Sequence, residues 1–198
     1  MMLNRTGLVY DEVMLSFFCD WDLNYPEHPD RIRKPFERCE FYGLVEKCVR
    51  LKVIFNLKLF IDRISSKLLR IFFKGRYCTD DELKVNHSDI AIENLKRSEH
   101  LNMDQRMDLS AHFDSVFFHP ESNRAVRYAV GSSLDLLDSI LEDRVDNGFA
   151  IIRPPGHHAM HDEPNGYCYF NTASILAKTA IQKHGLERVL IVDWDGNF

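Results

Sequence analysis

The stretch that decides the fold is Ile151-Ile152-Arg153-Pro154-Pro155-Gly156-His157-His158, which follows the turn signal Asn147-Gly148. Phe149 to Arg153 is a short apolar run, and we predict that it forms a buried strand. The Pro-Pro-Gly sequence stops this strand, so His157 and His158 are expected on the loop beyond its carboxyl end. The stretch therefore predicts two adjacent imidazoles at one edge of a sheet.

A helix and a second strand are expected next along the chain. Asn171 or Thr172 caps the helix and Gly185 ends it. Its apolar stripe recurs at spacings of three and four residues: Ala173, Leu176, Ala177, Ala180 and Ile181. Val189 to Val192 then reads as a second buried strand. A strand–helix–strand unit of this length has parallel strands, so their carboxyl ends share the sheet edge at which α/β folds bind ligands.

Acidic residues follow the second predicted strand at once. Asp193 and Asp195 are therefore expected to face His157 and His158 across the sheet edge. An aspartate that is hydrogen-bonded to an imidazole fixes its tautomer and favours the imidazolium. Carboxylates and imidazoles are also zinc ligands.

Three motifs in this order resemble the zinc-dependent histone deacetylases of class II, closest to class IIb. They are Arg-Pro-Pro-Gly-His-His at 153–158, Gly-Tyr-Cys-Tyr-Phe-Asn at 166–171 and Val-Asp-Trp-Asp at 192–195. The resemblance implies an arginase/deacetylase-like α/β fold, a mostly parallel sheet flanked by helices, with residues 1–198 forming part of one catalytic domain. It implies hydrolysis of acetyl-lysine amides, in which zinc polarises the carbonyl and a bound water attacks it. It also implies acetylated substrates such as histone tails or tubulin, in the cytoplasm, the nucleus or both.

Four residues match the catalytic and metal positions of this family. By resemblance, His158 is the general base and acid, and His157 is its electrostatic neighbour. Asp193 matches the carboxylate that pairs with His157. Asp195 matches the first zinc ligand.

Four further residues match positions that contact the substrate. Gly166 and Tyr167 match the wall of the acyl-lysine tunnel, with Tyr in place of the commoner Phe. Ser115 matches, by its distance from His157, a serine that contacts the substrate backbone, although a local backbone cap is an equal alternative. Arg31 matches an arginine of the internal channel beneath the metal, where paired hydrogen bonds could hold the departing acetate. The alternative for Arg31 is a solvated surface residue.

The sequence departs from the family after Asp195. The family continues with an aliphatic residue and His-His-Gly, whereas this chain reads Gly196-Asn197-Phe198. Asn197 takes the place of a histidine ligand, and we expect the third zinc ligand, the transition-state Tyr and the carboxylate partner of His158 beyond Phe198. Because catalytic zinc sites use three protein ligands, the 198-residue chain is expected to be inactive alone. Two alternatives for the chain remain: a non-catalytic binding fragment, or an unstable product of a mis-spliced or wrongly assembled gene. An alternative for the substrate is a polyamine or an arginase-type substrate.

Residues 53–74 interrupt a segment that is nearly continuous in the family. Apolar residues at three-to-four spacing predict an amphipathic helix with a basic remainder. This segment has three readings: a surface insertion, a helix that binds a membrane surface or a partner, or non-coding sequence. The charges within this segment disfavour a transmembrane span.

Composition limits the function classes. The chain has 198 residues, 45% hydrophobic content and a formal net charge of −5, so one domain with a core is expected and bulk charge does not indicate direct nucleic-acid binding. Five cysteines without a Cys-x-x-Cys pair favour a reducing compartment over a disulfide framework or a zinc finger. The first residues lack the pattern of a signal peptide.

Other elements are expected earlier in the chain. A strand is predicted over residues 6–11, and helices are predicted over 32–42, after 80 and over 123–141. His87 is expected to be structural rather than catalytic, and Cys168 to be a packing residue rather than a nucleophile.

Overall fold

The computed structural model describes residues 5–51 and 75–196. The predicted amphipathic helix of residues 53–74 and the substitution at Asn197 lie outside this range. The described chain contains a parallel sheet whose strands are β1 (Thr6–Val9), β2 (Cys48–Leu51) and β3 (Asn147–Ala150), in the order β2-β1-β3. The α/β class, the parallel sheet and the strand after residue 6 were predicted correctly.

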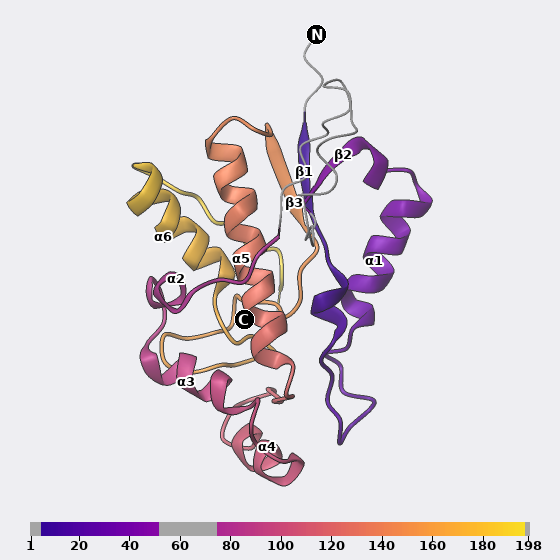
Figure 1. Ribbon diagram of the computed structural model, residues 1–198, viewed down its shortest axis with the longest axis vertical. Coiled ribbons are helices and arrows are strands. Elements are labelled where there is room, and N and C mark those ends of the chain that lie inside the picture. The colour runs from indigo at the N-terminus through magenta and orange to yellow at the C-terminus, as the bar shows by residue number, and fades with distance from the viewer. Residues whose placement is uncertain (1–4, 52–74, 197–198) are drawn as a thin grey trace, which may run out of the picture.

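Helices cover both faces of this sheet. The α1 helix (Asp30–Phe41) leads from β1 to β2, and the α5 helix (Ser122–Leu141) leads into β3. Figure 1 shows α1 on one side of the sheet and α5 with α6 (Thr172–His184) on the other. The connection from β1 to β2 and the connection from β2 to β3 run in opposite directions across the sheet, and right-handed crossovers of opposite direction place their helices on opposite faces. The central strand is consequently buried, with Leu8 3% and Val9 0% exposed.

Short helices complete the described part of the chain. The 3₁₀ turns η1 (Glu12–Leu15) and η2 (Val45–Lys47) flank α1, and α2 (Asp80–Lys84), α3 (Asp89–Arg97) and α4 (Met103–Ser110) precede α5. The α2 helix begins with a capping box, in which Thr79 and Glu82 satisfy each other's backbone N–H groups. Asn171 caps α6 and Gly185 ends it with φ +72°, as the sequence predicted.

The predicted strand at Val189–Val192 is wrong. These residues pair with no strand of the described chain, and Leu190 is 85% exposed. An apolar run becomes a buried strand only when another layer covers it, and no element of the described residues does so. The strand predicted over 149–153 is displaced, because β3 spans Asn147–Ala150 and so includes the Asn147-Gly148 pair that was predicted to be a turn. The strand was also predicted to be buried, whereas Phe149 is 58% exposed at the sheet edge.

The buried face of α6 is rotated from the predicted stripe. Thr172, Ile175 and Ala180 are the buried residues of this helix, whereas Ala173 and Ile181 are exposed. In a short helix rich in alanine and isoleucine, more than one stripe satisfies a spacing of three and four. The packing of α6 on α5, which is a tertiary effect, selects the stripe that contains Ile175.

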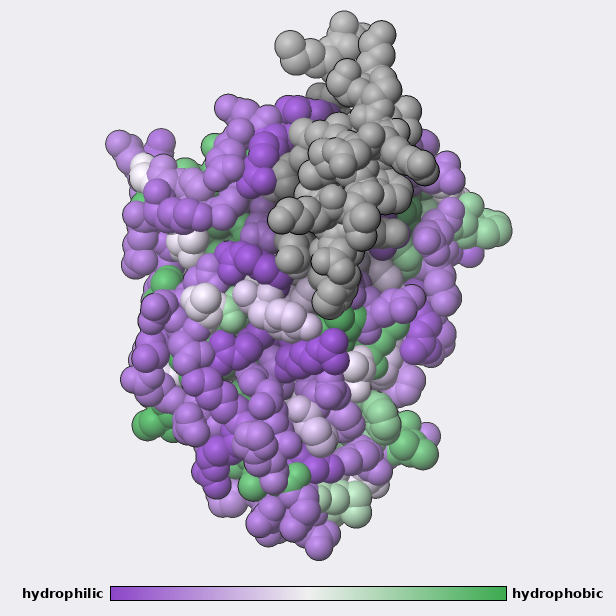
Figure 2. Space-filling view, in the orientation of Figure 1, coloured by the Kyte–Doolittle hydropathy of each residue, from purple (hydrophilic) through white to green (hydrophobic). Residues whose placement is uncertain are grey.

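The surface in Figure 2 is mostly hydrophilic, with apolar residues in small separate patches. Among the described residues, no helix combines the length and the apolar character that a membrane span would require.

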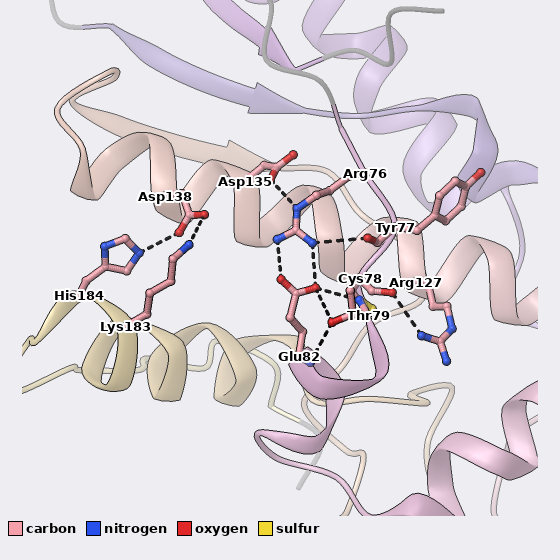
Figure 3. Close-up of polar contacts among 10 residues, drawn as sticks. All are labelled: Arg76, Tyr77, Cys78, Thr79, Glu82, Arg127, Asp135, Asp138, Lys183 and His184. Atoms are coloured by element: carbon pink, nitrogen blue, oxygen red, sulfur yellow. Dashed lines mark hydrogen bonds and ion pairs between the residues drawn. The ribbon is translucent and has the colours of Figure 1, made fainter.

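Polar contacts tie α2 and α6 to α5 (Figure 3). Arg76 donates to both carboxylate oxygens of Glu82, at 2.8 and 2.6 Å, and to Asp135 at 2.8 Å. On the next turn of α5, Asp138 accepts from Lys183 at 2.6 Å and contacts His184 at 2.8 Å. Burial alone would raise the pKa of Asp138, but these two partners lower it below its ordinary value. The ionised carboxylate therefore stabilises the packing of α6 on α5.

We expect Asp138→Asn to lower the free energy of unfolding by about 2 kcal/mol, between the values for exposed and for buried ion pairs. Because the folded pKa is depressed, this stabilisation is complete above the unfolded pKa of about 3.9 and is lost as the pH falls through the folded pKa. Urea unfolding at pH 7 and pH 3 measures it. Asp81→Asn, at an exposed aspartate of α2, is the control and should have little effect; an equal loss in both variants would contradict the prediction.

Candidate active site

The loop after β3 carries His157 and His158, as predicted. Its backbone packs closely against the start of α6, because a Cβ atom at Gly156 would lie 2.8 Å from both the Phe170 carbonyl oxygen and the Thr172 nitrogen. Glycine is therefore required where the loop turns toward the two histidines. The two imidazole rings lie 4.2 Å apart at an interplanar angle of 65°.

Both predicted aspartates lie against His157. Its Nδ1 atom is 2.9 Å from Asp193 Oδ2, and its Nε2 atom is 3.4 Å from Asp195 Oδ2. The Asp195 backbone N–H donates to the Asp193 carboxylate, and together with the His157 imidazole it lowers the pKa of Asp193. Asp193 therefore stays ionised and can fix the tautomer of His157. This pairing is the one that the resemblance assigned to these residues.

The donor chemistry at this place suits a metal ion. Ligand atoms of His157, His158 and Asp195 all lie within 4.8 Å of one another. Two ligand atoms on one zinc ion at about 2.0–2.2 Å each can be at most about 4.4 Å apart. The group is thus close to the span of a coordination sphere and has ligands that zinc accepts, but it is not a closed site. Asp195, whose side chain is 42% exposed, is the carboxylate that could turn toward a metal.

Steric contact places Gly166 against His158. A Cβ atom at Gly166 would be 2.7 Å from Cδ2 of the His158 ring, and the residue has φ +52°. Both facts require glycine. The next residue, Tyr167, also has a positive φ of 70°, which a non-glycine residue adopts only when its surroundings hold it there.

Backbone hydrogen bonds supply those surroundings. The N–H of Gly166 donates to the Asp114 carbonyl at 3.0 Å, and the N–H of Tyr167 donates to the Ser115 carbonyl at 2.9 Å. Ser115 itself has φ +54°, and its hydroxyl donates to Asp114 at 2.9 Å. The structure thus brings Ser115 beside Tyr167.

Arg31 reaches the same wall from the first turn of α1. Its guanidinium lies 5.6 Å from the centre of the Tyr167 ring, and it is 3.6 Å from Glu27. The side chain is 44% exposed, so the guanidinium is solvated, as in the alternative reading of the sequence, while it also lies against Tyr167. All eight predicted site residues are connected by contacts within one region at the carboxyl end of β3.

Two residues that sequence reasoning assigned no role hold this region together. Glu27 and Arg153 form a doubly contacting ion pair, at 2.7 and 2.6 Å, and each side chain is 1% exposed. Arg153 also donates to the Met14 carbonyl at 3.0 Å and lies 3.7 Å from the centre of the Phe17 ring. The sequence signal for Arg153 was a charged residue between an apolar run and two prolines. Its partner Glu27 lies 126 residues away, so this signal could not identify the ion pair.

His87 and Cys168 have the roles expected of them. His87 is 2% exposed, accepts from the Asn171 N–H at 2.8 Å and lies 3.3 Å from the His161 carbonyl. Burial lowers its pKa, so it is a neutral structural histidine that positions the start of α6. Burial raises the pKa of Cys168 to about 11, which keeps its thiol protonated and unreactive.

Comparison with known proteins identifies similar chains. A family model described as histone deacetylase domain matches residues 25–196. The chain is 34% identical over 192 residues to the human polyamine deacetylase HDAC10, covering 96% of this chain and 25% of that protein. It is 31% identical to the histone deacetylase clr3 of Schizosaccharomyces pombe, covering 98% and 26%. The chain thus spans about a quarter of the length of these curated relatives.

A solved structure shows the same fold. The crystal structure of the HDA15 HD domain aligns with a TM-score of 0.69 at 26% identity, and the alignment covers 91% of this chain and 45% of that one.

We expect Gly166→Ala to cost more stability than Gly185→Ala. Both glycines have positive φ, at 52° and 72°, but a Cβ at Gly185 meets nothing within 4 Å, whereas one at Gly166 overlaps the His158 ring. The Gly185 variant should lose about 1 kcal/mol through backbone strain alone, and the Gly166 variant about 3 kcal/mol. Chemical denaturation measures both, and equal losses would show that His158 does not lie against Gly166.

We expect Glu27→Gln to lower the free energy of unfolding by about 3–5 kcal/mol, because it leaves the buried Arg153 charge without its counter-ion. Glu46→Gln, at an exposed glutamate of η2, is the matched control and should stay within about 0.5 kcal/mol of the parent chain. Urea unfolding measures the free energy of unfolding of both variants. A loss below about 1 kcal/mol for Glu27→Gln would contradict the buried ion pair.

Proposed function

The chain belongs to the histone deacetylase family, and we propose that it contributes one side of a zinc-dependent site that hydrolyses the acetyl amide of a lysine side chain. The observation that carries this proposal is the contact of His157 with both Asp193 and Asp195, beside His158. An acid–base pair of imidazoles next to a carboxylate metal ligand is what amide hydrolysis at zinc requires.

The roles proposed here are those that the family resemblance implies, and the geometry is compatible with them. His158 would take a proton from the attacking water and later give it to the leaving amine. His157 is oriented by the ionised Asp193 and would stabilise negative charge beside His158. Asp195 would hold zinc, which when bound polarises the amide carbonyl and lowers the pKa of water.

The wall beside His158 would bind the acyl-lysine chain. The Tyr167 ring offers an apolar face for the methylene stem, and Gly166 leaves room for it to approach His158. The backbone around Ser115, held in register with Tyr167, would position the substrate main chain. Arg31, over the Tyr167 ring, would pair with the acetate product through its guanidinium.

We propose that the substrate is an acetylated primary amine, and that an acetylated lysine of a protein is the first choice. A relative whose printed name includes polyamine deacetylase is 34% identical, and two whose names are histone deacetylase are 31% identical. These values are too close to separate the two classes. A cytoplasmic or nuclear location remains part of this proposal.

We further propose that the 198-residue chain has no turnover by itself. Among the described residues, Asp195 is the one ligand that the resemblance assigns to zinc, and its segment is exposed. A catalytic zinc site uses three protein ligands. Residues outside the described range would have to supply the others, and the sequence has Asn197 where the family has a histidine.

Metal analysis after dialysis, with acetate release from an acetyl-lysine peptide, tests this. We expect well under one zinc per chain for the 198-residue protein and no acetate release. In any longer form that supplies further ligands, we expect zinc-dependent acetate release, which Asp195→Ala abolishes and His158→Gln lowers by about 10²–10⁴-fold.

His100→Gln is the control, because His100 is exposed and lies outside the candidate active site; it should leave the rate unchanged. One zinc per 198-residue chain, lost in Asp195→Ala, would contradict the expected lack of metal. Full activity of His158→Gln in the longer form would contradict the role of His158.

A further inference from the structure

Two half-buried cysteines lie where α1 leads into β2. Cys39 is in the last turn of α1, and Cys48 is the first residue of β2. Both are free thiols, and both pack against one apolar cluster that includes Phe36 and Val45. The 3₁₀ turn η2 connects the two elements and contacts both of them. The fold therefore brings together two thiols that one short turn separates in the sequence.

The backbone of Leu44 bridges the two cysteines. Its N–H donates to the Cys39 carbonyl at 2.9 Å, and its carbonyl accepts from the Cys48 thiol at 3.4 Å. Both cysteines thus lie within one hydrogen bond of the same residue. Leu44 is 46% exposed, so a dissolved molecule can reach this turn.

An electrostatic effect agrees with this proximity. Burial raises the pKa of Cys48, and the negative charge of a Cys39 thiolate raises it further. Charges on partly exposed groups act on each other mainly within about 10 Å. This effect and the shared apolar cluster place both thiols on the same side of the turn.

The other three cysteines of the chain are protected in the fold. Cys19, Cys78 and Cys168 are at most 4% exposed. Burial raises the pKa of each of these thiols, to about 12 for Cys78 and to about 11 for Cys168. Because a thiol reacts as the thiolate, these three cysteines are protonated and shielded from a dissolved oxidant. Cys39 and Cys48 are the two cysteines that remain open to oxidation.

We propose that Cys39 and Cys48 are a redox-sensitive pair that forms a reversible disulfide with glutathione disulfide as the oxidant. One cysteine thiolate attacks a sulfur of glutathione disulfide, which releases one glutathione thiolate and leaves a mixed disulfide on the protein. The second cysteine thiolate then attacks the protein sulfur of this mixed disulfide and releases the other glutathione. The protein loses two electrons and two protons, and the two glutathione molecules gain them.

The disulfide covalently joins the last turn of α1 to the first residue of β2. Disulfides of reducing compartments are usually transient and redox-sensing, and this pair suits that role because an excess of free thiol reverses the exchange. The pair lies at the opposite end of α1 from Arg31. Its oxidation requires neither zinc nor the proposed deacetylase activity.

Peptide mapping by mass spectrometry tests the proposal on the zinc-free 198-residue chain, after circular dichroism has shown that the chain is folded. The chain is incubated with excess glutathione disulfide at about pH 8, near the ordinary pKa of a thiol. The remaining thiols are then alkylated with iodoacetamide in urea. We expect an internal cross-link between Cys39 and Cys48 in most chains, and alkylation of the other three cysteines. Addition of dithiothreitol should restore both thiols.

Single variants identify the two partners. In Cys39→Ser and in Cys48→Ser, the remaining cysteine should keep glutathione as a mixed disulfide, because no second thiolate displaces it. Cys78→Ala, which removes a buried thiol, is the matched control and should form the cross-link as the parent chain does. Glutathione that persists on Cys39 or Cys48 of the parent chain, a cross-link to any other cysteine, or alkylation of both Cys39 and Cys48 after the incubation would overturn the proposal.

Discussion

A buried ion pair between Arg153 and Glu27 joins the two loops on which the candidate active site depends. Both side chains are 1% exposed, so neither charge can be solvated, and removal of either partner would leave an uncompensated charge in the interior. Burial lowers the pKa of Arg153, and the charge and hydrogen bond of Glu27 oppose this shift. The loop after β1 and the loop after β3 therefore have one mutual position in which the charges are satisfied.

The position of the backbone and ring at Gly166 and Tyr167 follows from that constraint. Glu27 also lies 3.6 Å from Arg31, which in turn lies over the Tyr167 ring. Tyr25, two residues before Glu27, meets the edge of the same ring at a centroid distance of 5.8 Å. The left-handed backbone at Gly166 and Tyr167 is held by hydrogen bonds to residues 114 and 115. Backbone strain at these two residues is thus offset by contacts with residues that lie elsewhere in the sequence.

Sequence reasoning predicted the local features well because their causes are local. Asn171 caps α6 because its own side chain accepts a hydrogen bond from the first turn. Gly185 ends the helix because a residue without a side chain adopts the left-handed conformation without strain. The resemblance placed His157 beside Asp193, and the structure has them 2.9 Å apart. The Arg153–Glu27 pair could not be predicted in this way, because it depends on a contact across 126 residues that no local pattern records.

The errors also have a common physical cause. Val189–Val192 is apolar enough for a buried strand, but burial is a property of the layer that covers a segment and not of the segment alone. The exposed residues Val189–Val192 lead directly to Asp193 and Asp195. Both carboxylates of the site therefore follow an exposed segment, whereas both imidazoles lie on the anchored loop after β3. Covering the run would restrict the positions of Asp195, and a metal bound by Asp195 would restrict the run. If Asp195 holds a metal ion as proposed, metal binding and burial of this segment would therefore favour each other.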